Sequence, residues 1–220
     1  MYEFEIRSNE YLKNSMTGYY DRDMESYKKS GILTPMHILK NLKRDISEQK
    51  LLAAKDKMKS AIKRFLARFT FSGDDDKIYV CVVPRSKAGF TEKQLYFKKA
   101  VQESVEEINL PNHILDGTDF IIRVKSTRTT HIRKEFDSVR IEPYPGIAKD
   151  TCRFHFPIKG KQILLIDDIY TIGCNVDEDF IQTLYDLGAS KVFFYAVGRT
   201  VKNANTPSKK NWRAIDEIYR

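Results

Sequence analysis

The sequence predicts an α/β fold with a central, mostly parallel sheet flanked by helices and with a helical N-terminal extension. Two observations lead to this fold class. Apolar runs of strand length at 77–84, 119–124, 163–166 and 191–197 alternate with segments in which apolar residues recur at helical spacing. Strands that alternate with helices usually pair in parallel. Residues 37–69, by contrast, carry helical spacing only, which predicts the extension.

Composition narrows the class of protein. A chain of 220 residues can bury one sizeable core with an appended helical segment. It has no run of 18 apolar residues, so we expect no membrane span, and its charged first residues are unlike a secretory signal. Three cysteines form no zinc or disulfide spacing, which favours a cytoplasmic location.

The extension is expected to cover residues 1–72 as a candidate hood or partner surface. Thr34 and Pro35 are typical of a helix start. Helical spacing follows at Ile38, Leu42, Ile46, Met58, Ile62 and Phe65. The net charge of +8 lies mainly in the first 70 residues and in a basic tail at 201–220. Either a nucleic-acid partner or an ordinary solvated helix face explains these charges.

The α/β domain is expected at 73–200, after a polar boundary at 72–76. A strand at 77–84 leads to a helix at 91–108 that Pro111 closes, and a third short strand follows at 119–124. The polar, basic segment 125–149 is too long for a plain connector.

The most informative part of the chain is residues 161–200. An apolar strand at 163–166 ends in Asp167 and Asp168, and a glycine loop to Asn175 opens an amphipathic helix that Gly188 ends. This unit places two carboxylates and a helix N-terminus at the carboxyl edge of a parallel sheet, where open α/β folds bind ligands. Backbone N–H groups there suit a phosphate, and carboxylates suit sugar hydroxyls or a hydrated metal ion.

The run ILLIDDIYTIGCN at 163–175 resembles the phosphoribosyl pyrophosphate (PRPP) motif of type I phosphoribosyltransferases. The resemblance implies that Asp167 and Asp168 hold the ribose hydroxyls and act in catalysis. It also implies that they touch Mg²⁺ carried with PRPP, directly or through water. The 5′-phosphate would lie in the loop formed by Thr171, Ile172, Gly173, Cys174 and Asn175. Asn175 stands where the family usually has Thr or Ser, but it can still cap the helix.

Two further features are similar to the same family. The run Val83–Lys87 follows the first apolar strand, where the family places its pyrophosphate loop, so Arg85, Ser86 and Lys87 are implied to bind pyrophosphate. The segment 125–140 corresponds to the family's hood loop, with Arg128 and Arg133 as catalytic candidates that supply positive charge. The order of features looks like the ComF-like branch, and the resemblance covers about 77–199.

The resemblance implies transfer of the phosphoribosyl group from Mg-PRPP to a nitrogenous acceptor, a base or an amine, with release of pyrophosphate. Many relatives are dimers, so a homodimer is expected. The alternative is a non-catalytic PRPP- or nucleotide-binding regulator, or an accessory of nucleic-acid processing. Tyr170 has two open interpretations, a ring that stacks on a base or a core residue.

Overall fold

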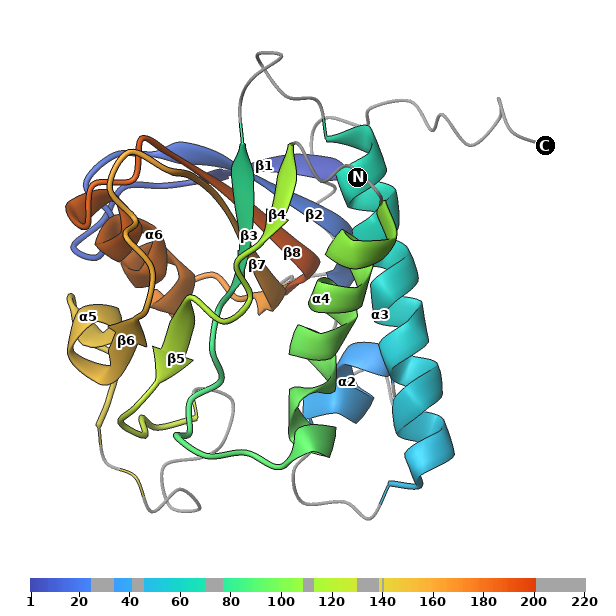
Figure 1. Cartoon of the computed structure of the whole chain (residues 1–220). Coiled ribbons are helices and arrows are strands. Elements are labelled where there is room, and N and C mark those ends of the chain that lie inside the picture. Colours follow the sequence, from blue (N-terminus) through green and yellow to red (C-terminus); the bar gives the residue numbers. More distant parts are fainter. Residues whose placement is uncertain are drawn as a thin grey trace.

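A computed structural model describes residues 1–24, 34–40, 46–69, 77–108, 113–129, 139 and 141–200. Its centre is a six-stranded sheet (Figure 1). In spatial order the strands are β1 (Tyr2–Ile6), β2 (Met16–Met24), β8 (Lys191–Thr200), β7 (Gln162–Tyr170), β3 (Ile78–Val82) and β4 (Ile114–Asp116). Neighbouring strands in this sheet are parallel except β1 and β2. The predicted mostly parallel sheet is confirmed.

Helices cover both faces of this sheet (Figure 1). One face carries α2 (Pro35–Lys40), α3 (Glu48–Arg68) and α4 (Tyr96–Ile108), the last preceded by the short helix η1 (Glu92–Leu95). The other face carries α5 (Ile147–Thr151) and α6 (Val176–Asp186). Side chains of β7 alternate between the two cores, with Leu164 and Ile166 on the α3 side and Ile163 and Leu165 on the α6 side.

The first 24 residues differ from the predicted helical extension. They form β1 and β2, and β2 pairs in parallel with β8. The signal was present in the sequence, because Tyr2, Phe4 and Ile6 alternate with Glu3 and Glu5 at the period of a strand. Within the described residues, the first part of the N-terminal segment therefore extends the central sheet, and the part from Pro35 is helical.

The predicted helices agree with the structure where it describes them. α2 begins at Pro35, and the N–H of His37 donates to Thr34 Oγ1 at 3.4 Å. Gly188 follows the end of α6 with a φ of 88°, a left-handed conformation that suits glycine. Leu42, the boundary at 72–76 and the tail at 201–220 lie outside the described residues. Among the described helices, none is long and apolar enough to cross a bilayer.

The strand predicted at 119–124 lies outside the central sheet. Its ordered part, β5 (Ile121–Arg123), pairs antiparallel with β6 (Cys152–Phe154) in a separate two-stranded sheet. β4, which the sequence reading missed, takes the place beside β3. Burial explains why β5 lies outside the central sheet. Ile122 is 39% exposed, whereas a strand inside a covered parallel sheet would bury both faces.

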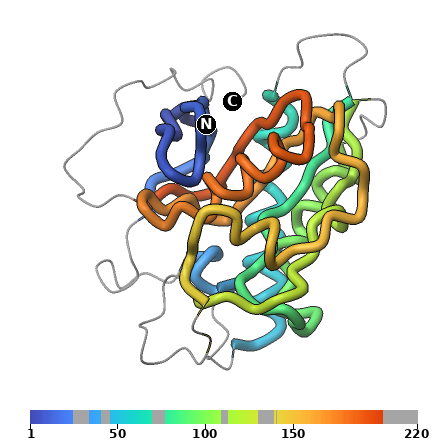
Figure 2. Tube along the Cα trace, turned by 90° about the vertical axis from the view of Figure 1, so that its left-hand side faces the viewer, coloured from blue at the N-terminus to red at the C-terminus, as the bar shows by residue number. Residues whose placement is uncertain are grey.

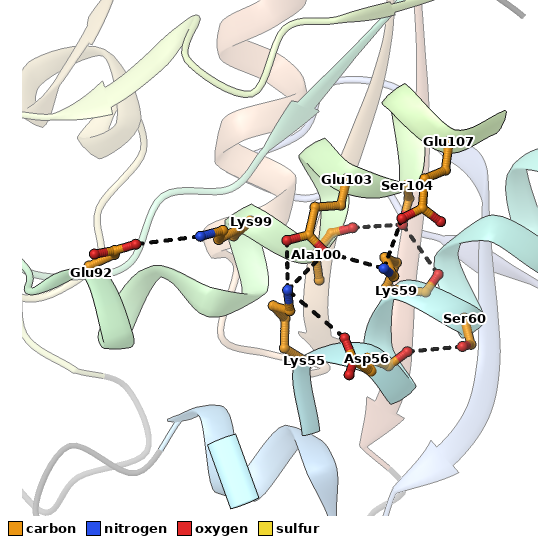
Figure 3. Close-up of polar contacts among 10 residues, drawn as sticks. All are labelled: Lys55, Asp56, Lys59, Ser60, Glu92, Lys99, Ala100, Glu103, Ser104 and Glu107. Atoms are coloured by element: carbon orange, nitrogen blue, oxygen red, sulfur yellow. Dashed lines mark hydrogen bonds and ion pairs between the residues drawn. The ribbon is translucent and has the colours of Figure 1, made fainter. Parts of the chain in front are cut away.

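A ladder of ion pairs joins α3 to α4 (Figure 3). Lys55, Lys59 and Lys63 stand one turn apart on α3 and pair with Glu103 and Glu107 of α4. Lys55 Nζ donates to both carboxylate oxygens of Glu103, at 2.6 and 2.9 Å. Part of the N-terminal positive charge is thus neutralised within the fold, which favours an ion-paired helix face over a nucleic-acid surface.

We expect Glu103→Ala to lower the free energy of unfolding by about 1–2 kcal/mol, because it leaves the buried Lys55 ammonium without this carboxylate. Burial alone would raise the pKa of Glu103, but the hydrogen bonds and charges of Lys55 and Lys59 lower it. The contribution is therefore present above the ordinary carboxyl pKa and is lost as the pH falls through the lowered value. Urea titrations at pH 7 and pH 3 measure this. Glu48→Ala, which breaks an exposed pair with Lys93, should change stability much less.

Candidate ligand site at the carboxyl edge of the sheet

The topology brings the two predicted ligand-binding segments together. β3 and β7 are parallel neighbours, with Val82 opposite Ile166. The Val83 N–H donates to the Ile166 carbonyl at 2.9 Å, so residues 83–88 leave the sheet next to Asp167 and Asp168. Two segments about 80 positions apart in the chain therefore share one edge of the sheet, as the parallel arrangement predicted.

Asp167 and Asp168 lie within β7 itself, which runs on to Tyr170. The Asp168 N–H donates to Asp167 Oδ1 at 2.7 Å, and Lys40 Nζ of α2 pairs with Asp168 Oδ1 at 2.8 Å. Burial alone would raise the pKa of Asp168, but Lys40 outweighs it and the pKa is lowered. Burial and the adjacent Asp168 charge raise the pKa of Asp167 to about 7. The two carboxyls therefore hold different charge states near neutral pH.

A third acidic residue, missed by the sequence reading, joins this pair. Asp177 in the first turn of α6 is 5% exposed and hydrogen-bonds through its side chain to Asp167. Burial and the Asp167 charge raise its pKa well above the ordinary value. The next two acidic residues of α6 make other contacts. Glu178 accepts a hydrogen bond from the Tyr170 hydroxyl at 2.7 Å, and Asp179 accepts one from the Ala148 N–H. The sequence does not reveal which face of α6 carries Asp177, and the structure places its side chain toward Asp167 of β7.

The predicted phosphate loop is a tight turn between β7 and α6. The Cys174 N–H donates to the Thr171 carbonyl at 3.0 Å, Gly173 has a φ of 82°, and Ile172 points to solvent with 42% exposure. The Thr171 hydroxyl bonds to the Thr200 hydroxyl at 2.8 Å, which ties the loop to the end of β8. Asn175 occupies the position before the helix, but its side chain makes no capping bond. The expected Asn175 cap is therefore wrong.

The reason lies in the backbone and in the N-terminal hairpin. Asn175 has a φ of 58°, a left-handed conformation that Asn tolerates better than most residues. Its side chain accepts from Asn9 Nδ2 at 3.3 Å and hydrogen-bonds to the Tyr11 hydroxyl. Asn9 and Tyr11 belong to the turn between β1 and β2, which lies beside the loop (Figure 2). Asn175 thus couples the turn 171–175 to the first strands.

Asn175→Thr should therefore destabilise the protein, although Thr is the residue usual at this place in the family that the motif resembles. A β-branched residue in the left-handed region costs about 1–2 kcal/mol. Asn175→Gly is the matched control, because it accepts the same backbone while losing the contacts with Asn9 and Tyr11. Thermal melts should rank wild type above the Gly variant and the Gly variant above the Thr variant. A Thr variant as stable as wild type would contradict the structure here.

The three predicted pyrophosphate residues follow β3, and each is bonded within the protein. The Arg85 guanidinium donates to the carbonyls of Leu39, Lys40 and Gln94 at 2.7–3.1 Å, and burial lowers its pKa. The Ser86 hydroxyl bonds to that of Thr129 at 2.9 Å. Lys87 Nζ donates to the Thr127 carbonyl at 2.9 Å. The structure thus places all three at the expected edge, with Arg85 turned toward α2.

Arg123 of β5 holds the backbone of the loop after β3 through hydrogen bonds. It is 9% exposed, and its guanidinium donates to the backbone carbonyls of Arg85, at 3.1 Å, and Pro84, at 3.4 Å, and to the Thr151 hydroxyl. From the sequence, Arg123 is predicted only as the end of a strand, because no local pattern reveals such a contact.

The predicted hood loop is described only at its two ends. The Arg128 N–H donates to the Ile141 carbonyl, and its Nε pairs with Glu142 at 2.7 Å. Arg128 therefore joins the two ends of the loop in this structure. Arg133 lies outside the described residues.

Tyr170 proves to be a core residue, which decides between its two interpretations. Its side chain is 4% exposed and its ring packs 4.7 Å from that of Phe4 of β1.

The acidic pair fits a magnesium ion that arrives with a polyphosphate. Carboxylate oxygens are donors that Mg²⁺ prefers, and such an ion keeps most of its waters and needs only one or two protein carboxylates. Among the described residues no group of three or more His, Cys, Asp or Glu side chains could hold an ion by itself. Asp167 and Asp168 could thus contribute to a shared site without forming a complete one.

No protein-family model matches the sequence, and no curated protein matches it. Solved structures with a similar outline include a hypoxanthine-guanine-xanthine phosphoribosyltransferase, 15% identical, covering 70% of this chain and 73% of that one with a TM-score of 0.37. The hypoxanthine phosphoribosyltransferase of Trypanosoma cruzi is 11% identical over 71% and 73%, with a TM-score of 0.39. A hypoxanthine-guanine phosphoribosyltransferase of Bacillus anthracis is 12% identical over 76% and 78%, with a TM-score of 0.36. At these values the likeness carries no argument about this chain, whose function is argued from its own residues.

Proposed function

We propose that the protein is a phosphoribosyltransferase that binds Mg-PRPP at the carboxyl edge of β3 and β7. One observation carries the proposal: the acidic pair at 167–168 and the basic loop at 83–88 lie side by side, joined by the bond between Val83 and Ile166. Carboxylates suit a ribose diol and a basic loop suits a pyrophosphate, and PRPP carries both groups on adjacent carbons. The order of these features also supports the ComF-like branch.

In this proposal each segment has a separate task. Asp167 and Asp168 accept hydrogen bonds from the ribose hydroxyls, the turn 171–175 receives the 5′-phosphate with backbone N–H groups, and residues 85–87 receive the pyrophosphate. Magnesium, carried by the ligand, would neutralise charge on the departing pyrophosphate. The protein accelerates the reaction by holding the anomeric carbon between acceptor and leaving group and by stabilising the separating charge. Arg128 and Arg133 are proposed to close over this site from the hood.

Release of pyrophosphate from PRPP tests the proposal. Purine bases, pyrimidine bases, ammonia and small amines are supplied as acceptors with Mg²⁺, and PRPP binding is measured in parallel by calorimetry. An enzyme should release pyrophosphate with one acceptor class and lose this activity with EDTA. Binding without release across the panel supports the alternative, a PRPP- or nucleotide-binding regulator. Absence of PRPP binding would contradict the enzyme, and absence of nucleotide binding as well would contradict the regulator.

A further inference from the structure

The carboxyl end of α2 lies on two of the groups that the proposed function assigns to the ligand. Lys40 Nζ pairs with Asp168 at 2.8 Å, at the carboxylate proposed for the ribose. The Arg85 guanidinium, proposed for the pyrophosphate, donates to the Leu39 carbonyl at 3.0 Å and to the Lys40 carbonyl at 3.1 Å. One helix end therefore contacts both halves of the site.

These contacts compete with the ligand on chemical grounds. Arg85 uses three of its five N–H groups on backbone carbonyls, and two of those carbonyls, of Leu39 and Lys40, belong to the end of α2. A phosphate that binds through both terminal nitrogens must displace at least one of the three carbonyls. A carbonyl oxygen and a phosphate oxygen at one guanidinium also repel each other. Asp168 Oδ1 is likewise engaged by an ammonium group where a ribose hydroxyl would donate. The helix end and a pyrophosphate thus compete for the N–H groups of Arg85.

The other side of α2 is held by apolar packing, in contrast to the polar contacts at its carboxyl end. Met36 and Leu39 are 1% and 7% exposed and pack into the core below the helix. Met36 packs closely on β8, because a Cβ added at Gly198 would lie only 2.9 Å from Met36 Sδ. Apolar packing is less directional than the polar contacts of Lys40 with Asp168 and of Arg85 with the carbonyls.

We propose that α2 is a displaceable cover of the ligand site. In the ligand-free chain its carboxyl end occupies Asp168 and Arg85, and binding exchanges these contacts for ribose hydroxyls and pyrophosphate oxygens as the helix turns about its packing contact at Met36. This inference rests on the proposed PRPP site. It implies that the free protein binds PRPP more weakly than the open site would, because opening is subtracted from the binding energy.

Lys40→Met tests this, since it keeps the apolar stem and removes the ammonium. The dissociation constant for PRPP with Mg²⁺, measured by calorimetry at a pH high enough to keep Asp168 ionised without Lys40, should fall about tenfold or more, as expected for one hydrogen bond between charged groups. Lys93→Met is the matched control, because Lys93 pairs with Glu48 on the surface, and it should leave the affinity unchanged. If wild type binds PRPP and the Lys40 variant binds equally or more weakly, the cover is wrong. If neither binds, the proposed function fails and the cover with it.

A second measurement follows the helix directly. With methionine methyl groups labelled for NMR, and the Met36 signal assigned from Met36→Leu, PRPP should shift that signal in wild type. In ligand-free Lys40→Met the signal should already lie part of the way toward its ligand-bound position, because the variant populates the open state. A Met36 signal that PRPP leaves unmoved would overturn the proposal, as would one identical in the two ligand-free proteins.

Discussion

Asp168→Asn should lower pyrophosphate release from PRPP at least about a hundredfold while the protein stays folded. Asp168 is the ionised member of the acidic pair, since Lys40 lowers its pKa despite burial. An amide can accept only through one neutral oxygen, so it would hold the ribose diol loosely and let the anomeric carbon drift from its position. Steady-state rates, with circular dichroism to confirm folding, measure the effect.

Asp119→Asn is the control for this variant, because Asp119 is an exposed carboxylate that pairs only at the surface, with Lys98. Its rate should equal that of wild type. If Asp168→Asn keeps a tenth or more of the wild-type rate, the acidic pair does not have the proposed role.

Asp177→Asn should stabilise the protein at high pH while leaving the proposed ligand groups in place. Burial raises the pKa values of both Asp167 and Asp177, with the charge of Asp168 also raising that of Asp167 and the charge of Asp167 that of Asp177. The folded chain therefore binds protons that the unfolded chain releases near pH 4. The free energy of unfolding of wild type should therefore fall as the pH rises from about 4 through 7. An asparagine amide at 177 can donate to Asp167 without a proton from solvent.

The expected gain for Asp177→Asn is about 1–3 kcal/mol at pH 8 and close to zero at pH 4, measured by urea titration at both values. Asp186→Asn on the same helix is the control, because its pKa is lowered by Lys13 and Gln182 despite burial and it should give no such gain. A variant whose stability changes with pH as steeply as that of wild type would show that the two carboxyls do not share a proton.

Three strands of the central sheet, β3, β7 and β8, could be predicted from the sequence because they are continuous apolar runs. β7 and β8 bury both faces, so their residues needed no register to be recognised. β1 and β2 were harder, since one is a short alternating strand and the other mixes Tyr with Asp and Arg. Their place in the sheet depends on the pairing of β2 with β8, a contact between the two ends of the chain that local patterns do not encode.

The candidate site divides in the same way. Asp167 and Asp168 were predicted because parallel strands end at one edge of the sheet, and the loop at 83–87 because it resembles the family's pyrophosphate loop. Lys40, Asp177 and Asn9 were missed because each reaches the edge from another element, namely α2, the buried side of α6 and the N-terminal hairpin. The orientation of Arg85 toward α2 could not be predicted either, since it depends on carbonyls more than 40 positions away in the chain.

A crystal structure of the chain with PRPP and Mg²⁺ tests the central proposal most directly. It should show the ribose diol against Asp167 and Asp168, the 5′-phosphate in the turn 171–175 and the pyrophosphate against residues 85–87, with Lys40 withdrawn from Asp168. A ligand bound elsewhere on the protein, or a pyrophosphate that does not contact the loop after β3, would contradict it.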